Sequence, residues 1–141
     1  NLKREDCENV CVEYVSSADL FKMSDILTIH TKLSARTRGY IDNNNLKLMK
    51  KSSIIVNTSR GPIIKEHDLI NALNNNIVSC AALDVYDQEP LPRDHMLRKT
   101  KNLILTPHIG YVSEEAYEKF FNGYFNAIKA FINQKPINQI S

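Results

Sequence analysis

The sequence has few glycines and lacks the glycine-rich loop that many nucleotide-binding proteins use to hold phosphates. Only four glycines occur among the 141 residues, at positions 39, 61, 110 and 123, and none belongs to a Gly-x-Gly-x-x-Gly pattern. A complete dinucleotide-binding domain usually holds the pyrophosphate with that loop at its first strand–helix turn. Either this is not a nucleotide-binding fold, or the first half of such a fold is absent from this chain.

Other absences exclude further classes of protein. No apolar run approaches the ~18 residues of a membrane span, and the first residues show no signal-peptide pattern. The net charge is only +2 and the basic residues are scattered, so we expect neither nucleic acid nor a membrane surface as a partner.

The cysteines number three, at positions 7, 11 and 80. Cys7 and Cys11 could form half of a metal site, but no second ligand pair follows at zinc-like spacing, so we predict no metal. Cys80 lies inside an apolar run and is expected to be a small core residue. A reduced, cytoplasmic protein fits this cysteine usage best.

Four short apolar runs, rich in β-branched residues, alternate with helical patterns. The runs cover residues 26–30, 54–56, 78–85 and 103–105, and helical spacing covers 18–23, 43–50 and 66–75. Continuous short runs suit parallel strands that are buried on both faces. The alternation therefore predicts βαβ units, right-handed crossovers and a parallel sheet in an α/β fold.

A long amphipathic helix is predicted near the end of the chain. Ser113 is a suitable N-cap, Glu114 and Glu115 favour the positive end of the helix dipole, and Pro136 follows the last turn. An aromatic and aliphatic stripe runs along it: Tyr117, Phe120, Phe121, Tyr124, Phe125, Ile128, Phe131 and Ile132. We interpret this stripe as core packing, with contact to a missing domain or another subunit as the alternative.

Three polar residues of complementary chemistry stand at or just past the ends of three apolar runs. They are Arg60, Glu89 and His108. In an open α/β sheet, ligands bind in the crevice outside the carboxyl ends of the strands. A cation, a carboxylate and an imidazole are therefore predicted to converge on one active site, although the sequence separates them by almost fifty positions.

Three ordered motifs carry a family resemblance. Residues 56–62 read VNTSRGP, residues 82–90 read ALDVYDQEP, and residues 105–110 read LTPHIG. Together with SDILTIH at 24–30, TRG at 37–39 and PIN at 136–138, they resemble the D-isomer-specific 2-hydroxyacid dehydrogenases over nearly the whole chain.

The resemblance implies a Rossmann-type doubly wound parallel sheet without its first βαβ unit and glycine loop. Residues 1–141 would then be the C-terminal portion of a dinucleotide-binding domain, ending in a long amphipathic helix, and the substrate domain would be absent. We expect this fragment alone to be inactive and to bind the cofactor poorly. The full-length protein is expected to be a homodimer.

The resemblance also implies roles for individual residues. Arg60 would bind the carboxylate and carbonyl oxygens of a 2-oxo acid, His108 would act as acid and base, and Glu89 would pair with that histidine. Asp84 would accept a hydrogen bond from the nicotinamide carboxamide. The remaining cofactor pocket would be lined by Thr31, Thr58, Ser59 and Gly110, together with Arg60 and His108.

The implied activity is reversible hydride transfer between a nicotinamide cofactor and a small 2-oxo or 2-hydroxy acid. NAD is the expected cofactor, and NADP stays open because the discriminating residue would precede Asn1. Glu89 is Glu and not Gln, which is unlike the formate dehydrogenase branch. Tyr111 and Val112 depart from the residues common in the family, so the acid is not identified. The alternative is an NAD(H)-sensing interaction module of the corepressor type.

Overall fold

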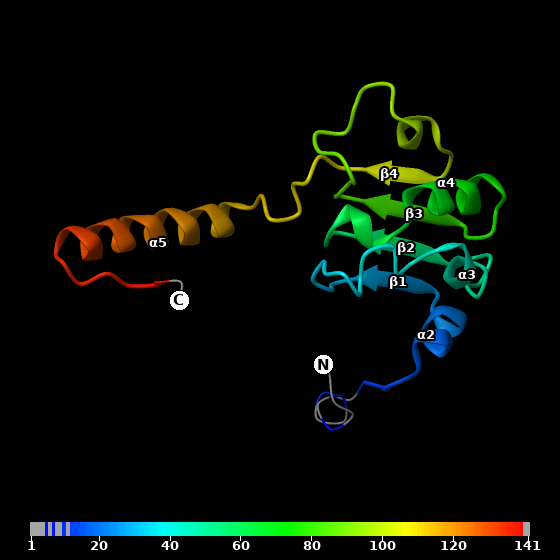
Figure 1. Ribbon diagram of the computed structural model, residues 1–141, viewed down its shortest axis with the longest axis horizontal. Helices are drawn as coiled ribbons and strands as arrows, with labels where there is room; N and C mark the ends of the chain where they lie inside the picture. Colours follow the sequence, from blue (N-terminus) through cyan, green and yellow to red (C-terminus); the bar gives the residue numbers. More distant parts are fainter. Residues whose placement is uncertain (1–4, 6, 8–9, 11, 140–141) are drawn as a thin grey trace. The chain divides into compact units, whose positions relative to one another are not determined.

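The computed structural model describes residues 5, 7, 10 and 12–139. Four parallel strands form one sheet in the order β1-β2-β3-β4, and they lie side by side in chain order (Figure 1). The strands are β1 (Ile26–Ile29), β2 (Ile54–Asn57), β3 (Cys80–Leu83) and β4 (Leu103–Leu105). The predicted parallel α/β sheet is confirmed.

Helix α2 (Ser17–Met23) precedes β1. The connections between the strands hold the other two predicted helices and two short 3-10 turns: α3 (Asn43–Leu46), η1 (Gly61–Ile63), α4 (Glu66–Asn74) and η2 (Met96–Lys99). Helix α3 is shorter than the predicted 43–50, since the chain already leaves the helix at its C-cap, Lys47. Asp42 forms a capping box with Asn45, which accounts for the first run of three asparagines. Helix α4 begins after Lys65, whose side chain makes no capping bond.

The core lies on one face of the sheet. Ile55 and Ala81 are fully buried opposite each other, and side chains from α3 and α4, such as Leu46 and Leu69, complete the cluster. The expectation that the strands are buried on both faces is wrong for this chain. Strand β1 alternates exposed and buried residues, and Ile104 on β4 is exposed. The helices whose side chains join the core cover one face, so side chains that point to the other face keep contact with solvent.

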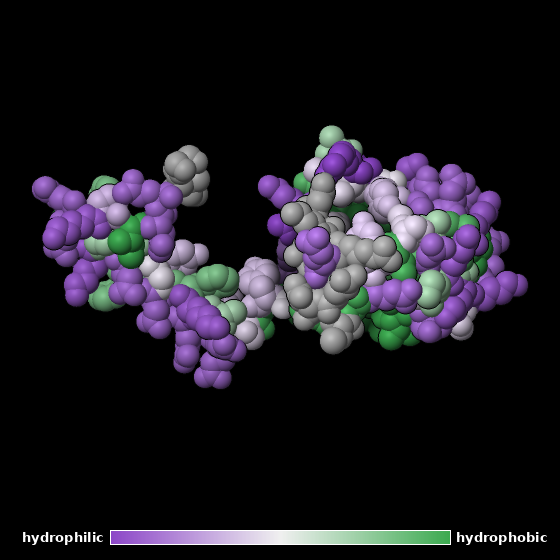
Figure 2. All heavy atoms as spheres, turned by 90° about the horizontal axis from the view of Figure 1, so that it is seen from below, coloured by the Kyte–Doolittle hydropathy of each residue, from purple (hydrophilic) through white to green (hydrophobic). Residues whose placement is uncertain are grey.

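The chain divides into two compact units, residues 1–108 and 109–141. The second unit holds α5 (Glu114–Ile132), which Ser113 caps by accepting a hydrogen bond from the Ala116 N–H at 3.2 Å. Within its own unit the stripe on α5 is not covered, since its eight side chains are 48–74% exposed. Figure 2 shows apolar residues of this unit at the surface, among polar ones. The alternative interpretation, contact with another domain or subunit, stays a prediction.

Two other expectations concern cysteine and membranes. Cys80 lies in β3 and is half-buried, and neither Cys7 nor Cys80 forms a disulfide. Cys11, and with it the suggested Cys7–Cys11 pair, lies outside the described residues. Among the helices that the structure describes, none has the length and hydrophobicity to cross a membrane.

Candidate active site

Arg60 is positioned by the turn that follows β2. The fully buried amide of Asn57 closes this turn, because its Nδ2 donates to the Arg60 carbonyl at 3.0 Å and its Oδ1 accepts from the Ser59 N–H at 3.0 Å. The next residue, Gly61, lies against the main chain of Tyr86 and Asp87, which follows β3. A Cβ at this position would lie 2.1 Å from the carbonyl carbon of Tyr86, so no larger residue fits. The Arg60 side chain is exposed, and its Nη1 donates to the Ser59 carbonyl at 2.6 Å.

A cavity of about 450 Å³ lies at the carboxyl ends of β1 and β2. Its lining includes Thr31, Ser59 and Arg60, three of the residues predicted to contact the cofactor. Ser59 Oγ donates to the Thr31 carbonyl at 2.5 Å and so joins the two strand ends. Thr58 is exposed beside them. His30 also lines the cavity, where its Nε2 lies 2.8 Å from Thr28 Oγ1.

The ends of β3 and β4 are joined by side chains. Asp84 follows β3 and is buried; its carboxylate accepts a hydrogen bond from Thr106 Oγ1 just past β4. The hydroxyl of Tyr86 lies 2.6 Å from the Thr106 carbonyl oxygen and 3.2 Å from that of Leu83. Burial, followed by the nearby charge of Asp84, raises the pKa of Tyr86, so the phenol stays a hydrogen-bond donor.

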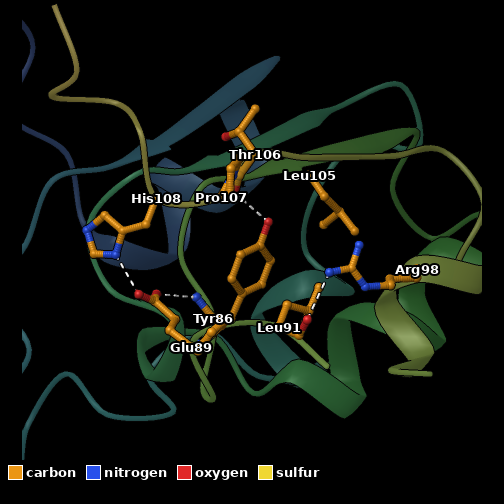
Figure 3. Close-up of a pocket in the computed structure, with 9 residues that line it drawn as sticks. Tyr86, Glu89, Leu91, Arg98, Leu105, Thr106, Pro107 and His108 are labelled. Carbon is orange, nitrogen blue, oxygen red and sulfur yellow. Dashed lines mark hydrogen bonds and ion pairs between the residues drawn. The ribbon is translucent and has the colours of Figure 1, made fainter. Parts of the chain in front are cut away.

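Glu89 and His108 meet at this edge of the sheet. His108 Nδ1 lies 2.5 Å from Glu89 Oε2, and Glu89 Oε1 accepts from the Tyr86 N–H at 2.9 Å (Figure 3). Both side chains are about one-third exposed. The φ of His108 is +58°, in the left-handed region that non-glycine residues rarely occupy, and such backbone strain is concentrated at functional sites.

The charges around Glu89 link it to both other members of the predicted trio. Burial tends to raise its pKa, but the hydrogen bonds from His108 and from the Tyr86 N–H oppose this. The positive charges of His108 and Arg60 act in the same direction, and the net effect lowers the pKa of Glu89. The carboxylate is therefore ionised at neutral pH; it contacts the imidazole directly, and the charge of the Arg60 guanidinium acts on it without a direct contact among the described hydrogen bonds and ion pairs.

A second cavity, of about 280 Å³, opens beside the pair. Its lining joins Glu89 and His108 to apolar side chains and to one further cation, Arg98 (Figure 3). An imidazole against a carboxylate, with cations nearby, can transfer protons to and from an anionic ligand. Among the residues that the structure describes, no group of three or more His, Cys, Asp or Glu could hold a metal ion.

Sequence reasoning placed most of the site but missed its supports. Gly110 belongs to the second unit, 109–141, and its role stays a prediction. Asn57 and Tyr86 were not predicted to position the site, although each holds one half of it through hydrogen bonds. A polar amide at the end of an apolar run was the available signal for Asn57. Arg98 had no signal in the sequence.

Comparisons with known proteins agree with this geometry. A family model described as "D-isomer specific 2-hydroxyacid dehydrogenase, NAD binding domain" matches residues 1–110. A hydroxypyruvate reductase of Blautia hydrogenotrophica is 36% identical over 139 residues, which is 99% of this chain and 43% of that protein. A glyoxylate reductase of Aeropyrum pernix is 44% identical over 113 residues, 80% of this chain and 34% of that protein.

A solved structure has the same fold. The phosphoglycerate oxidoreductase of Vibrio cholerae is 30% identical with a TM-score of 0.81, and the match covers 94% of this chain and 44% of that one. In each of these matches, this chain spans less than half of the relative's length.

Proposed function

This chain belongs to the D-isomer-specific 2-hydroxyacid dehydrogenase family, and we propose that it carries the catalytic edge of an NAD-dependent oxidoreductase. The substrate would be a small 2-oxo acid, reduced reversibly to the D-2-hydroxy acid. The similarity to a hydroxypyruvate reductase and a glyoxylate reductase supports this class of substrate. The remaining part of such an enzyme, with a substrate domain and the glycine loop, would lie outside these 141 residues.

The observation that carries the proposal is the 2.5 Å contact of the Glu89–His108 pair, whose carboxylate also feels the charge of Arg60. An ionised carboxylate at this distance orients the imidazole and holds a proton on Nδ1. The proton exchanged with the substrate is then the one on Nε2. Arg60 would orient the acid, because a planar guanidinium binds a carboxylate through two parallel hydrogen bonds and stays charged at any working pH.

The proton balance follows from these roles. When bound, the nicotinamide supplies a hydride to C2 of the 2-oxo acid or accepts one from the hydroxy acid. As the C2=O bond becomes a single bond, His108 Nε2–H donates its proton to the oxygen and the ring becomes neutral. In the oxidative direction, neutral His108 removes the hydroxyl proton and Glu89 stabilises the imidazolium that results. The two directions therefore need opposite protonation states of His108, while Glu89 stays ionised in both.

The residues at this edge fit a nicotinamide ring. Asp84 presents a buried carboxylate at the end of β3, and its chemistry suits the N–H donors of a carboxamide. Thr31, Thr58 and Ser59 provide hydroxyl and backbone groups at the β1–β2 ends, around a cavity that is large enough for part of a cofactor. The cofactor named for the family domain is NAD, and we assign no preference over NADP.

The test uses the full-length protein that contains this chain. NADH and NADPH are titrated by fluorescence, and small 2-oxo acids such as glyoxylate, hydroxypyruvate and pyruvate are screened for cofactor oxidation. We expect turnover of at least one acid, and a loss of about 10²-fold or more in kcat for His108→Ala with cofactor binding retained. The isolated 141-residue chain, assayed beside it, is expected to be inactive.

Two results would contradict the proposal. Cofactor binding without turnover of any acid would favour the sensing module, and wild-type kcat in His108→Ala would remove the histidine from the chemistry.

A further inference from the structure

Glu89 lies on a loop that has no regular secondary structure of its own. The loop comprises residues 87–95, which connect β3 and its tail to η2, and residues 87–90 are exposed. A carboxylate on such a loop can pair with His108 at 2.5 Å only if the loop is held at both ends. The beginning is held by Tyr86, whose N–H binds Glu89 and whose hydroxyl lies against the Thr106 carbonyl.

The far end of this loop is held by Arg98. Its Nε donates to the Pro92 carbonyl at 2.8 Å, and its Nη2 donates to the Leu91 carbonyl at 2.8 Å. Figure 3 shows the guanidinium reaching the main chain at Leu91, on the side of the cavity opposite His108. Two donors of one planar group on successive carbonyls fix both the position and the orientation of the loop.

Arg98 also lies on the segment that leads to the histidine. It belongs to η2, and the chain continues from there through β4 to Thr106 and His108. His95 anchors the start of η2 by two further contacts. Its Nδ1 accepts from the Leu97 N–H at 3.3 Å, and its Nε2 lies 3.3 Å from Glu66 on α4. Arg98 therefore joins the loop that carries one partner to the strand that carries the other.

We infer that Arg98 is a positioning residue for the Glu89–His108 pair, an inference that rests on the proposed function for its kinetic part. By clamping the Leu91 and Pro92 carbonyls, Arg98 keeps the Glu89 carboxylate at hydrogen-bonding distance from the imidazole. Without the clamp, the loop would move, and misplacement of about 1 Å is enough to reduce a rate by ~10²-fold.

A competing use of Arg98 is direct binding of an anionic substrate, because the guanidinium lines the cavity next to His108. The two uses differ in kinetics. A direct contact made equally in the ground and transition states would act on KM, whereas a positioning residue would act on kcat. The two uses also differ in their effect on the titration of His108. Only a positioning role moves the Glu89 carboxylate relative to the imidazole when Arg98 is replaced.

The experiment compares Arg98→Met and Arg98→Lys in the full-length protein, with Lys99→Met as the matched control. Lys99 is the next residue of η2 and is exposed, so its substitution removes one positive charge from the same turn. Arg98→Lys keeps the charge but cannot bridge both carbonyls. Kinetics are measured with the acid that the wild type reduces, and the His108 ring is titrated by NMR after ¹⁵N-histidine labelling.

Positioning predicts a loss of about 10-fold or more in kcat for Arg98→Met, with KM and the NADH Kd changed less than about 2-fold. It also predicts that the pH midpoint of His108 falls by about 0.5 or more in both Arg98 variants, because Glu89 then holds the imidazolium less firmly. Loss of the positive charge of Arg98 alone would raise the midpoint of His108. The direction of the change therefore separates loss of charge from displacement of Glu89. In a Glu89→Gln background, Arg98→Lys should produce no further fall.

Three outcomes would overturn the inference. They are an unchanged or raised His108 midpoint in Arg98→Lys, an increase in KM with wild-type kcat, and a fall in the midpoint that persists in full without Glu89. The NMR titration needs no turnover, so it decides the inference even if no acid proves to be a substrate. If Arg98→Met does not fold, Arg98→Lys carries the same test.

Discussion

The two halves of the carboxyl edge are built differently. At the end of β2, the main chain of Arg60 is fixed from within the core: the fully buried Asn57 side chain closes its turn, and the close approach of Tyr86 leaves no room for a side chain at Gly61. At the β3–β4 ends, Glu89 and His108 are held by side-chain hydrogen bonds on a partly exposed loop. The proposed substrate anchor, Arg60, thus depends on the packing of the fold, whereas the proposed acid–base pair, Glu89 and His108, depends on a network of side-chain hydrogen bonds.

This difference predicts that changes in the first half cost stability and that changes in the second alter chemistry. The largest effect is expected for Gly61→Ala. The new Cβ would lie 2.1 Å from the Tyr86 carbonyl carbon and 2.6 Å from the Asp87 nitrogen, and both are backbone atoms that cannot rotate away. We expect the free energy of unfolding to fall by about 3 kcal/mol, at the upper end for overpacking.

Urea denaturation of the full-length protein measures this loss, with Gly123→Ala as the control. Gly123 lies inside α5, and a Cβ there meets nothing within 4 Å, so the control should gain about 0.5–1 kcal/mol. Equal stabilities for the two variants would mean that the β2 and β3 ends can separate without cost, contrary to the comparison.

Sequence reasoning predicted the strands, the helices and the trio because these signals are local. Apolar runs indicate strands, and a polar residue just past such a run indicates a position at the carboxyl edge of the sheet. The supports were missed because no apolar run or helical spacing reveals their partners. Gly61 is constrained by the backbone of Tyr86, and Arg98 donates a hydrogen bond to the Leu91 carbonyl, seven residues earlier. The partner of the α5 stripe stays a prediction for a related reason, because periodicity shows that a face is apolar but not what covers it.

An intermediate effect is expected for Asn57→Ala. The truncation removes the fully buried side-chain amide that pairs the Arg60 carbonyl and the Ser59 N–H, and leaves these part-buried groups without their partner. Such unpaired groups cost about 1–3 kcal/mol, so we expect a loss of about 2 kcal/mol in the free energy of unfolding. Because Arg60 loses its support, KM for the 2-oxo acid should rise while the His108 titration stays at its wild-type position. A shift in that titration would show that the two halves are coupled.

The smallest effect on stability, and the sharpest test of the second half, is the acid dependence of Glu89→Gln. Although burial opposes it, the bonds and charges of His108, Tyr86 and Arg60 lower the pKa of Glu89 below its ordinary value of 4.5 in the folded protein. A carboxyl group with a lowered folded pKa stabilises the protein above its unfolded pKa. This contribution is lost as the pH falls through the folded value.

Wild type should therefore lose this contribution as the pH falls below about 4.5, whereas Glu89→Gln should lack it throughout. The carboxylate is one-third exposed, so solvent screening keeps the difference at pH 7 below about 1 kcal/mol, and the two unfolding curves should converge in acid. Melting temperatures measured from pH 3 to pH 7 test this. Parallel curves would mean that Glu89 gains nothing from its partners in the folded state. A difference well above 1 kcal/mol would mean that the β3–β4 half, like the β1–β2 half, supports the fold as well as the chemistry.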